Sequence, residues 1–160
     1  MYDDMHEIIK DFLWLGNSYA AFEKENLKKL GIKKILSVWD HNGPNYNEND
    51  FIHKKIKIAD IYSQNIIQYF GECLNFIKGD EKVFVHCLAG SSRSASFVIA
   101  YLMWSQKKTF SEAFDFIKSI RFISPNDGFQ EQLKMFEKLL VENDYNLDKI
   151  NFKEVKWKPI

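Results

Sequence analysis

The sequence predicts an α/β domain in which one central mixed sheet is flanked by helices. Short apolar stretches of strand character alternate with amphipathic stretches of helical period along the 160 residues, a pattern typical of a sheet layered with helices. Hydrophobic residues make up 46% of the chain and aromatic residues 16%, which is enough for a packed core. At this length we expect a single domain.

The first part of the chain alternates strands with helices. Apolar stretches bounded by Gly, Pro and Asn predict strands, and apolar residues at every third or fourth position predict helices. Two glycines are expected to stop the helices in the left-handed conformation. The predicted elements are a strand over 12–16, a helix over 18–32 stopped at Gly31, a strand over 32–38, a polar loop over 39–50, a strand over 51–60 that ends at Asp60, and a helix over 63–80 capped by Asn65 and stopped at Gly79.

The second part of the chain is predicted to add one strand and three helices. The helix after the strand is apolar nearly all round, as expected at the centre of a domain. The next helix opens with Thr109 and Glu112 in the spacing of a capping box. These elements are a strand over 82–87, helices over 92–105 and 109–120, and a last helix that begins at 125–126. Because 145–160 show no clear period, we expect a domain over 1–144 and a C-terminal tail over 145–160.

A loop of small residues joins the strand to the apolar helix in the stretch VFVHCLAGSSRSASFVIAYLM, residues 83–103. Consecutive backbone N–H groups at the start of a helix form a cradle for anions, and Gly90 can adopt angles that other residues resist. Cys87 and Arg93 stand at the two ends of this loop. Of the 22 basic residues only Arg93 and Arg121 are arginines, and arginine holds two phosphate oxygens with its planar fork.

This loop predicts chemistry at phosphorus. A cysteine at the mouth of an anion cradle is stabilised as its thiolate, which is the nucleophilic form of the side chain. A thiolate beside a bound phosphate can attack the phosphorus and form a phosphocysteine intermediate. The residue types at the two ends of the loop are therefore those that a phosphatase with a cysteine nucleophile requires.

The segment HCLAGSSRSA, residues 86–95, resembles the HCxxGxxRS signature of the protein tyrosine phosphatase superfamily. Its details are most similar to a dual-specificity phosphatase of the small, atypical, single-domain kind. Further segments resemble that family in the family's order: FLWLGNSYAA with LKKLGIKKILSV, IADIYSQNI, AYLM and RFISPNDGFQEQL. The resemblance implies the cysteine-phosphatase fold. It also implies hydrolysis of phosphotyrosine and of phosphoserine or phosphothreonine, because short surface loops leave a shallow pocket.

The resemblance implies roles for the reacting groups. Cys87 is expected to attack the phosphorus, and Arg93 is expected to hold the phosphoryl oxygens together with the amides of the loop. Asp60 is expected to protonate the leaving oxygen and then to help activate water. The expected phosphate-binding positions are Leu88, Ala89, Gly90, Ser91, Ser92 and Arg93.

Three further residues are expected to support the reaction. Ser94 would donate to the Cys87 sulfur, His86 would orient the loop from beneath, and Asn126 would tie the loop to its neighbours. The resemblance implies no metal and no organic cofactor. The expected partner is a phosphoprotein substrate, with a kinase among the candidates, and the sequence leaves the oligomeric state open.

Other functions remain open on the sequence. The same chemistry fits a phosphoinositide, an RNA 5′-triphosphate or a phosphoglucan, although the neutral residues Leu88, Ala89, Ser91 and Ser92 argue against a highly anionic lipid. A phosphate-binding module of the pseudophosphatase type is a second alternative, against which the retained Cys87 argues. Sulfur transfer or redox chemistry at Cys87, as in rhodanese-like relatives, is a third.

The bulk composition excludes several classes of partner. A formal net charge of zero indicates neither nucleic acid nor an anionic membrane. The N-terminus shows no signal pattern, and the longest apolar run, 95–104, is too short to span a bilayer. Two cysteines predict a reducing, intracellular location, in the cytoplasm with the nucleus as a further candidate.

Several residues near these motifs are assigned structural roles. Cys73 lies on an apolar helical face and is expected in the core, although it could also trap an oxidised Cys87. Arg121 is expected to satisfy the terminal carbonyls of a helix. The acids Asp40, Glu48 and Asp50 are expected to form a solvated rim, and Lys54, Lys55 and Lys57 a wet strand face.

Overall fold

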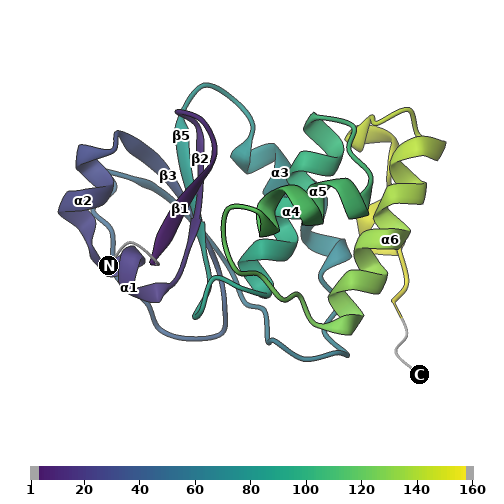
Figure 1. Ribbon diagram of the computed structural model, residues 1–160, viewed down its shortest axis with the longest axis horizontal. Helices are drawn as coiled ribbons and strands as arrows, with labels where there is room; N and C mark the ends of the chain where they lie inside the picture. The colour runs from purple at the N-terminus through teal and green to yellow at the C-terminus, as the bar shows by residue number, and fades with distance from the viewer. Residues whose placement is uncertain (1–3, 158–160) are drawn as a thin grey trace.

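The computed structural model describes residues 4–157, which form a five-stranded sheet between two groups of helices (Figure 1). β1 pairs antiparallel with β2, and the other neighbouring strands are parallel, so the predicted mixed sheet is confirmed. The strand order is β1-β2-β5-β3-β4. The strands are β1 (Met5–Ile9), β2 (Leu13–Gly16), β3 (Ile32–Val38), β4 (Ile52–Ile56) and β5 (Lys82–His86).

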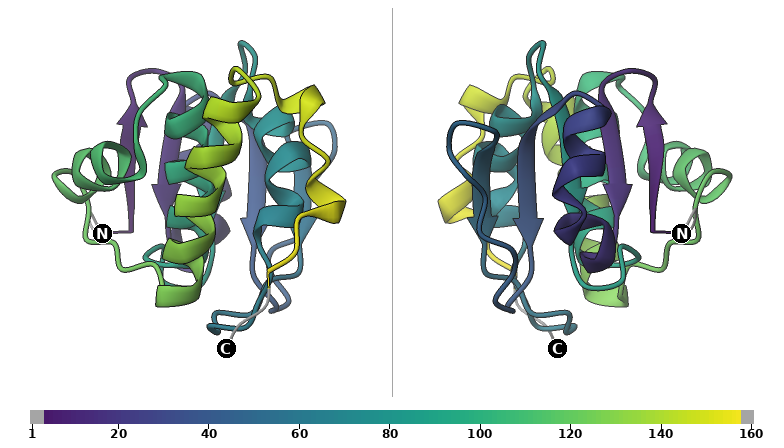
Figure 2. Two further views of the ribbon diagram at one scale, coloured as in Figure 1. Left: turned by 90° about the vertical axis from the view of Figure 1, so that its right-hand side faces the viewer. Right: turned by 90° about the vertical axis from the view of Figure 1, so that its left-hand side faces the viewer.

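Helices cover both faces of the sheet, as Figure 2 shows from two sides. On one face α1 (Ser18–Phe22) and α2 (Lys24–Lys29) pack on a smaller core that contains Leu27, Ile35 and Phe84. On the other face lie α3 (Phe70–Ile77), α4 (Arg93–Ser105), α5 (Phe110–Lys118) and α6 (Asp127–Glu142), over the larger core. Within residues 4–157 no helix combines the length and the apolar character needed to cross a bilayer.

The strand β5 and the helix α4 form the central unit of the fold. β5 lies between β2 and β3, and every residue of α4 from Arg93 to Met103 is buried. The predicted burial of this helix on all sides is thus confirmed. Residues 87–92 connect the two elements at the carboxyl ends of the parallel strands, the edge at which α/β sheets commonly bind ligands.

The sequence located several helix ends correctly. Gly31 has a φ of +82°, which is the left-handed stop expected there. Thr109 and Glu112 form both hydrogen bonds of a capping box. The Asn126 side chain accepts a hydrogen bond from the Phe129 N–H and so caps α6. These signals are local, which is why a single sequence reveals them.

Other boundaries differ from prediction. β1 was not expected, and because only Ile8 among its residues is buried, it lacks the alternation that reveals a strand. The helix predicted over 18–32 breaks at Glu23, whose ψ is 65°. The helix predicted over 63–80 is shorter, with a 3-10 turn, η1 (Ile67–Tyr69), ahead of α3.

The strand predicted to end at Asp60 ends four residues earlier, at Ile56. Beyond that point the backbone bonds to side chains instead of to β3. The Ile58 carbonyl accepts from Arg93, and the Ala59 N–H donates to the Gln64 side chain. Asp60 therefore lies on an irregular segment that side chains hold next to the loop.

The chain after α6 packs back onto the larger core. It forms two 3-10 turns, η2 (Leu147–Lys149) and η3 (Phe152–Glu154). The Phe152 ring lies 5.9 Å from that of Phe136 and against Gly71. The Trp104 indole N–H donates to the Tyr145 carbonyl at 2.9 Å. Described residues of the tail thus contribute buried surface to the domain.

Candidate active site

Each carbonyl group in the loop between β5 and α4 forms a hydrogen bond with a group that lies outside the hollow of the loop. The donors come from different parts of the chain. His86 Nδ1 lies 3.1 Å from the Cys87 carbonyl, and the Leu88 carbonyl accepts from the Ser18 N–H. Arg121 donates to the Ala89 and Gly90 carbonyls. The Ser91 carbonyl accepts from the Ser124 N–H, and the Ser92 carbonyl accepts from the N–H and the hydroxyl of Ser96.

This arrangement fixes where the backbone N–H groups point. The described residues contain no cis peptide bond, and in a trans peptide the N–H and C=O groups point in opposite directions. Carbonyls held outward therefore turn the N–H groups from Leu88 to Arg93 toward the inside of the loop. One of these, the Gly90 N–H, donates to Cys87 Sγ at 3.2 Å. The result is a ring of donors around the sulfur.

Gly90 is required at its position for two reasons. Its φ is +71°, a conformation that residues with a Cβ rarely adopt. A Cβ there would lie 2.5 Å from the backbone of Gly16 and 2.6 Å from Arg121 Nη2. The expectation that Gly90 supplies special backbone angles is confirmed, and the close approach to β2 adds a second constraint.

Cys87 lies on the floor of the loop and is only 2% exposed. Its sulfur accepts a second hydrogen bond, at 3.0 Å, from the hydroxyl of the buried Ser94. Two donors and the N-terminus of α4 favour negative charge at this atom. The sulfur thus lies on the floor of the loop, beneath its inward amide groups.

Arg93 closes the open side of the loop while keeping part of its fork available. Nη1 donates to Asp40 Oδ1 at 2.8 Å and to the Ile58 carbonyl at 3.0 Å. The buried Nε makes no hydrogen bond with any residue that the structure describes. A guanidinium fixed at Nη1 retains the edge that carries Nε and Nη2, which can bind two oxygens of a phosphate.

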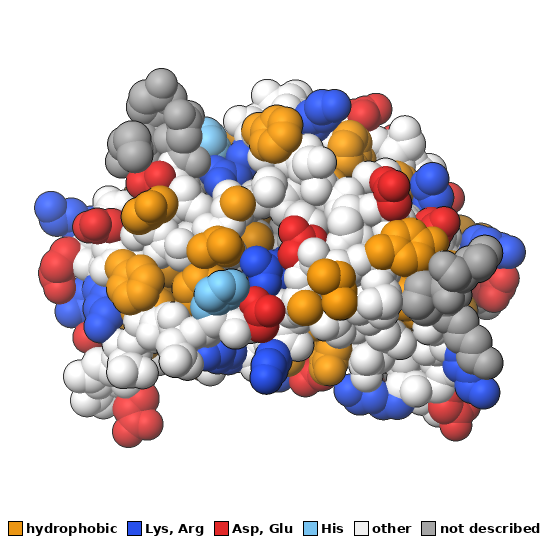
Figure 3. Space-filling model, turned by 90° about the horizontal axis from the view of Figure 1, so that it is seen from below, with side chains coloured by type: hydrophobic (Ala, Val, Ile, Leu, Met, Phe, Trp, Pro, Cys, Tyr) orange, Lys and Arg blue, Asp and Glu red, His pale blue; other side chains and the backbone are white. Residues whose placement is uncertain are grey.

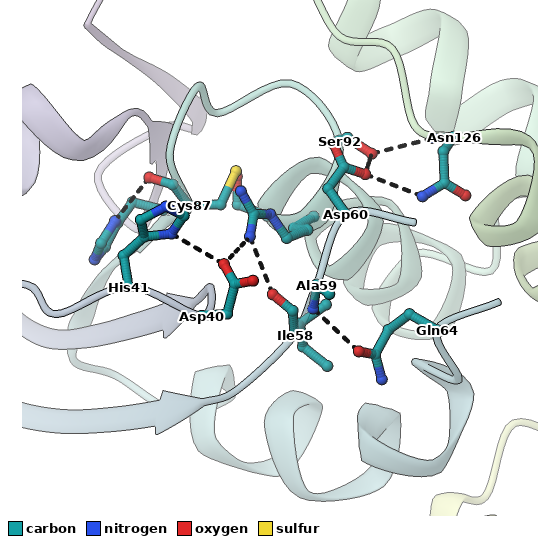
Figure 4. A network of polar contacts seen from close by, with 12 residues as sticks. Asp40, His41, Ile58, Ala59, Asp60, Gln64, Cys87, Ser92 and Asn126 are labelled. Carbon is teal, nitrogen blue, oxygen red and sulfur yellow. Dashed lines mark hydrogen bonds and ion pairs between the residues drawn. The ribbon is translucent and has the colours of Figure 1, made fainter. Parts of the chain in front are cut away.

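Asp40 was expected in a solvated rim, and it is exposed as expected, but it also pairs with Arg93, which the sequence did not predict. Its carboxylate pairs with Arg93 and lies 2.9 Å from His41 Nδ1 (Figure 4). The hydrogen bond from Arg93 holds the pKa of Asp40 below its ordinary value. A nearly buried guanidinium needs such a partner, because an unpaired charge in the interior is costly.

Asp60 is held beside the loop by hydrogen bonds from two donors, Ser92 and Asn126 (Figure 4). Its Oδ1 accepts from the Ser92 hydroxyl at 2.7 Å and from the Asn126 amide at 3.0 Å. The Ser92 hydroxyl also accepts from the Asn126 backbone N–H. These contacts engage Oδ1 of Asp60, and they join the start of α6 to the loop.

His86 lies under the loop and is fully buried. Its Nε2 lies 2.6 Å from the Ser37 hydroxyl, and its ring stacks on Phe84. Burial lowers the pKa of His86 to about 4, so the imidazole is neutral near pH 7.

Arg121 has a different position from the one expected. It is 7% exposed, and instead of helix-terminal carbonyls it bonds the Ala89 and Gly90 carbonyls, both at 3.0 Å. The scarcity of arginine in the chain, which pointed to Arg93, was a signal for Arg121 as well. Its planar fork suits two neighbouring carbonyls as it suits two phosphate oxygens.

The remaining candidates lie outside the loop. Cys73 is buried in the core, and burial raises the pKa of its thiol to about 12. Asp50 pairs with Lys28 at 3.3 Å, so it is not merely solvated, and Lys54 pairs with Glu72 at 3.0 Å. Among residues 4–157 no group of His, Cys, Asp and Glu side chains is arranged to hold a metal ion.

The surface around the loop is both charged and apolar. Figure 3, seen from below the view of Figure 1, shows basic, acidic and His side chains close together near the centre, with hydrophobic groups beside them. Leu88 is 46% exposed, and Tyr19 and Phe122 are more exposed still. The Ser18 N–H bond to the Leu88 carbonyl brings the start of α1 to this rim.

Comparison with known proteins gives a consistent family. Residues 13–139 match the family model described as "Dual specificity phosphatase, catalytic domain". The chain is 42% identical over 134 residues to dual specificity protein phosphatase 1-B of Xenopus laevis, covering 81% of this chain and 36% of that protein. It is 36% identical over 147 residues to dual specificity protein phosphatase 1 of Arabidopsis thaliana, covering 89% and 74%.

Solved structures share the fold. The human tyrosine phosphatase-like serine/threonine/tyrosine-interacting protein superposes with a TM-score of 0.81 at 35% identity, covering 87% of this chain and 99% of that one. The cysteine-phosphatase fold expected from the sequence is therefore confirmed. The chain spans little more than a third of the length of the first curated relatives that it matches.

The contacts of Arg121 predict a specific defect. Arg121→Met removes the donors of the Ala89 and Gly90 carbonyls, and buried polar groups left unpaired cost about 1–3 kcal/mol each. Because the amides then lose their fixed direction, orthovanadate should bind about tenfold more weakly, or worse. Calorimetry measures this affinity. Lys118→Met, which removes an exposed cation of α5, is the matched control. Unchanged vanadate affinity in Arg121→Met would contradict the bracing role.

Burial of His86 predicts how stability depends on pH. Because its pKa falls from 6.5 to about 4 in the fold, the unfolded chain gains a proton there before the folded chain does. The stability associated with a neutral, buried His86 is fully present above pH 6.5. About 3 kcal/mol of the free energy of unfolding is then lost as the pH falls to about 4. Urea denaturation across this range measures the slope. His86→Gln should flatten it, and an equally steep slope in that variant would refute the assignment.

Proposed function

The chain belongs to the dual specificity phosphatase family, and we propose that it is an active protein phosphatase that hydrolyses phosphotyrosine and phosphoserine or phosphothreonine. The observation that carries this proposal is Cys87 Sγ within a ring of inward amides, beside the Arg93 guanidinium, whose Nε has no hydrogen-bond partner among residues 4–157. A tetrahedral oxyanion matches those donors in charge and in number.

The proposed reaction has two steps. The Cys87 thiolate attacks phosphorus, so that an S–P bond forms as the bond from phosphorus to the leaving oxygen breaks, and Asp60 gives that oxygen its proton. Asp60 then takes a proton from water, which attacks phosphorus and releases inorganic phosphate and the thiolate. The N–H groups from Leu88 to Arg93 and the Arg93 edge stabilise the charge on the phosphoryl oxygens in both steps.

Supporting residues are proposed to act on the reacting groups. Ser94 donates to the sulfur and eases its departure as a thiolate in the second step. His86 holds the Cys87 carbonyl. Asn126 joins Asp60 to the loop through its amide and through the Ser92 hydroxyl. The reaction drawn from these side chains uses no metal or organic cofactor.

The proposal extends to the substrate and to the domain. The partner is a phosphoprotein, with a kinase as one candidate, because the variable loop positions Leu88, Ala89, Ser91 and Ser92 carry no charge suited to a polyanionic lipid. Residues 1–144 are proposed as the catalytic domain and 145–160 as a C-terminal extension. Two free cysteines fit the proposed intracellular location, cytoplasmic or nuclear.

The first test is turnover. Wild-type protein should release phosphate from phosphotyrosine and phosphothreonine peptides, and Cys87→Ser should lose essentially all of this activity because serine is not ionised near neutral pH. Phosphoinositide, RNA 5′-triphosphate and phosphoglucan are assayed in parallel. Faster turnover of any of these three would overturn the protein substrate. Phosphopeptide binding without turnover by the wild type would indicate a pseudophosphatase.

The second test addresses Asp60. Without an acid, a leaving group that needs a proton departs slowly, so Asp60→Ala should lower kcat on a phosphoserine peptide by about 10²-fold or more. On p-nitrophenyl phosphate, whose leaving group is stable without a proton, the loss should be much smaller. Asp115→Ala, in an exposed part of α5, is the control. Equal losses on both substrates would exclude Asp60 as the acid.

A further inference from the structure

A chain of side-chain hydrogen bonds crosses the sheet and ends at the loop. His53 Nε2 of β4 lies 2.7 Å from the Ser37 hydroxyl of β3, and the same hydroxyl lies 2.6 Å from His86 Nε2 of β5. His86 Nδ1 in turn lies 3.1 Å from the Cys87 carbonyl. The register pairs Ile35 with His53 and Ser37 with His86, which places all three polar side chains on one face of the sheet.

The proton positions along this chain follow from what each atom can do. A carbonyl only accepts, so His86 Nδ1 carries the proton that bonds the Cys87 carbonyl. The buried imidazole is neutral near pH 7, because its pKa is about 4, so Nε2 is an acceptor. The Ser37 hydroxyl therefore donates its single proton to His86. His53 Nε2 must then be the donor to Ser37.

In the part of the chain that the structure describes, the Ser37 hydroxyl is the hydrogen-bond partner of His86 Nε2. The imidazole is fully buried between Phe84, stacked at 5.6 Å, and the edge-on ring of Trp39 at 5.0 Å. Ser37 is 1% exposed. Removing the hydroxyl would take away the donor that bonds Nε2 among the described residues, and the ring would lose the contact that sets its rotation.

The effect reaches the site through a single peptide group. The Cys87 carbonyl and the Leu88 N–H belong to the same planar peptide and point in opposite directions. When His86 holds the carbonyl beneath the loop, the Leu88 N–H is aimed into the ring of donors. A turn of the imidazole therefore changes the direction of a donor beside the nucleophile.

We propose that His53 and Ser37 are positioning residues for the phosphatase reaction, acting through His86 to fix the peptide that joins Cys87 to Leu88. The inference rests on the proposed function and extends it to residues outside the loop. His53 and Ser37 both line a cavity of about 440 Å³, together with Trp39, Tyr46 and Lys55. The far end of the chain is thus open to solvent while His86 is not.

Other groups that face His53 bear on its protonation. The Tyr46 ring packs edge-on at 4.8 Å, and Lys55 follows two residues later on the same strand. Burial, with a smaller contribution from the Lys55 charge, lowers the pKa of His53. Whether His53 is neutral or charged, the chain requires a proton on Nε2. The direction of the chain therefore does not depend on the charge of His53.

The proton positions are tested first, on the wild-type protein. In ¹⁵N-labelled protein near pH 7, the ring-nitrogen shifts should show His86 protonated at Nδ1 and unprotonated at Nε2, and His53 protonated at Nε2. The opposite tautomer at His86, or an unprotonated Nε2 at His53, would overturn the proposal. This readout involves no substitution, so it does not depend on whether a variant folds.

The kinetic test compares a variant that removes the Ser37 hydroxyl with a variant that retains a hydroxyl at this position. Ser37→Ala should lower kcat/KM by about tenfold, the size expected for a lost contact of about 1.4 kcal/mol. It should also move the acid limb of the pH profile of kcat/KM to higher pH, because a less fixed loop stabilises the thiolate less. Ser37→Thr, which keeps the hydroxyl, should restore both values.

The outer residue is tested in the same way. His53→Phe keeps a ring but loses the donor and should show the same change with a smaller amplitude, about threefold. His53→Gln places an amide donor near the position of Nε2 and should recover the wild-type profile. Ser105→Ala, which removes a hydroxyl that donates to the Tyr101 carbonyl far from the loop, is the matched control for stability.

The outcomes separate this proposal from the proposed function. If the wild type and Cys87→Ser are equally inactive, the phosphatase assignment fails. If the wild type turns over and Ser37→Ala and His53→Phe keep its pH profile, the positioning role fails alone. A fall in melting temperature with an unchanged acid limb also counts against the proposal, because it shows that Ser37 only stabilises the fold.

Discussion

The direction of the peptide groups between Cys87 and Arg93 is the constraint on which the rest of the structure depends. A loop that turns consecutive N–H groups inward must turn its carbonyls outward, where each needs a donor. The fold supplies donors from β5, the start of α1, the segment after α5 and the first turn of α4. The elements around the loop can be understood as the source of these donors.

The composition of the loop follows from the same constraint. Each carbonyl of the loop meets a donor from a neighbouring part of the fold, and at Gly90 this close approach leaves no room for a side chain. A Cβ there would meet the backbone of β2. Leu88 is the large residue of the loop, and it is exposed because its side chain projects away from the protein. At Gly90 the small residue is therefore a packing requirement as well as a conformational one.

The sequence predicted what is encoded locally and missed what depends on distant contacts. The strand, loop and helix around Cys87 were predicted because residues 82–105 contain their own signals: an apolar run, small residues and a buried helix. The pairing of Asp40 with Arg93 and that of Arg121 with the loop were missed because the partners lie 53 and 31 residues apart, respectively. No periodicity or capping pattern reports such a pair. The chain from His53 to His86 went unnoticed for the same reason, since its residues meet only through strand register.

The charges at the site explain why so many hydrogen bonds are used to orient the peptide groups of the loop. A phosphate monoester brings negative charge to a place where a thiolate already carries one. Two guanidinium forks lie at the loop: the fork of Arg121 is bound to the Ala89 and Gly90 carbonyls, and part of the charge of Arg93 is offset by Asp40 at 2.8 Å. Attraction sufficient to bind the substrate must therefore come largely from fixed dipoles, the inward amides and the N-terminus of α4. Dipoles act at short range and only in the right direction. A small rotation of one of these peptides therefore changes the electrostatic potential at the site, as a change in charge would. This is why buried donors such as His86 and Arg121 form hydrogen bonds with the carbonyl groups of the loop.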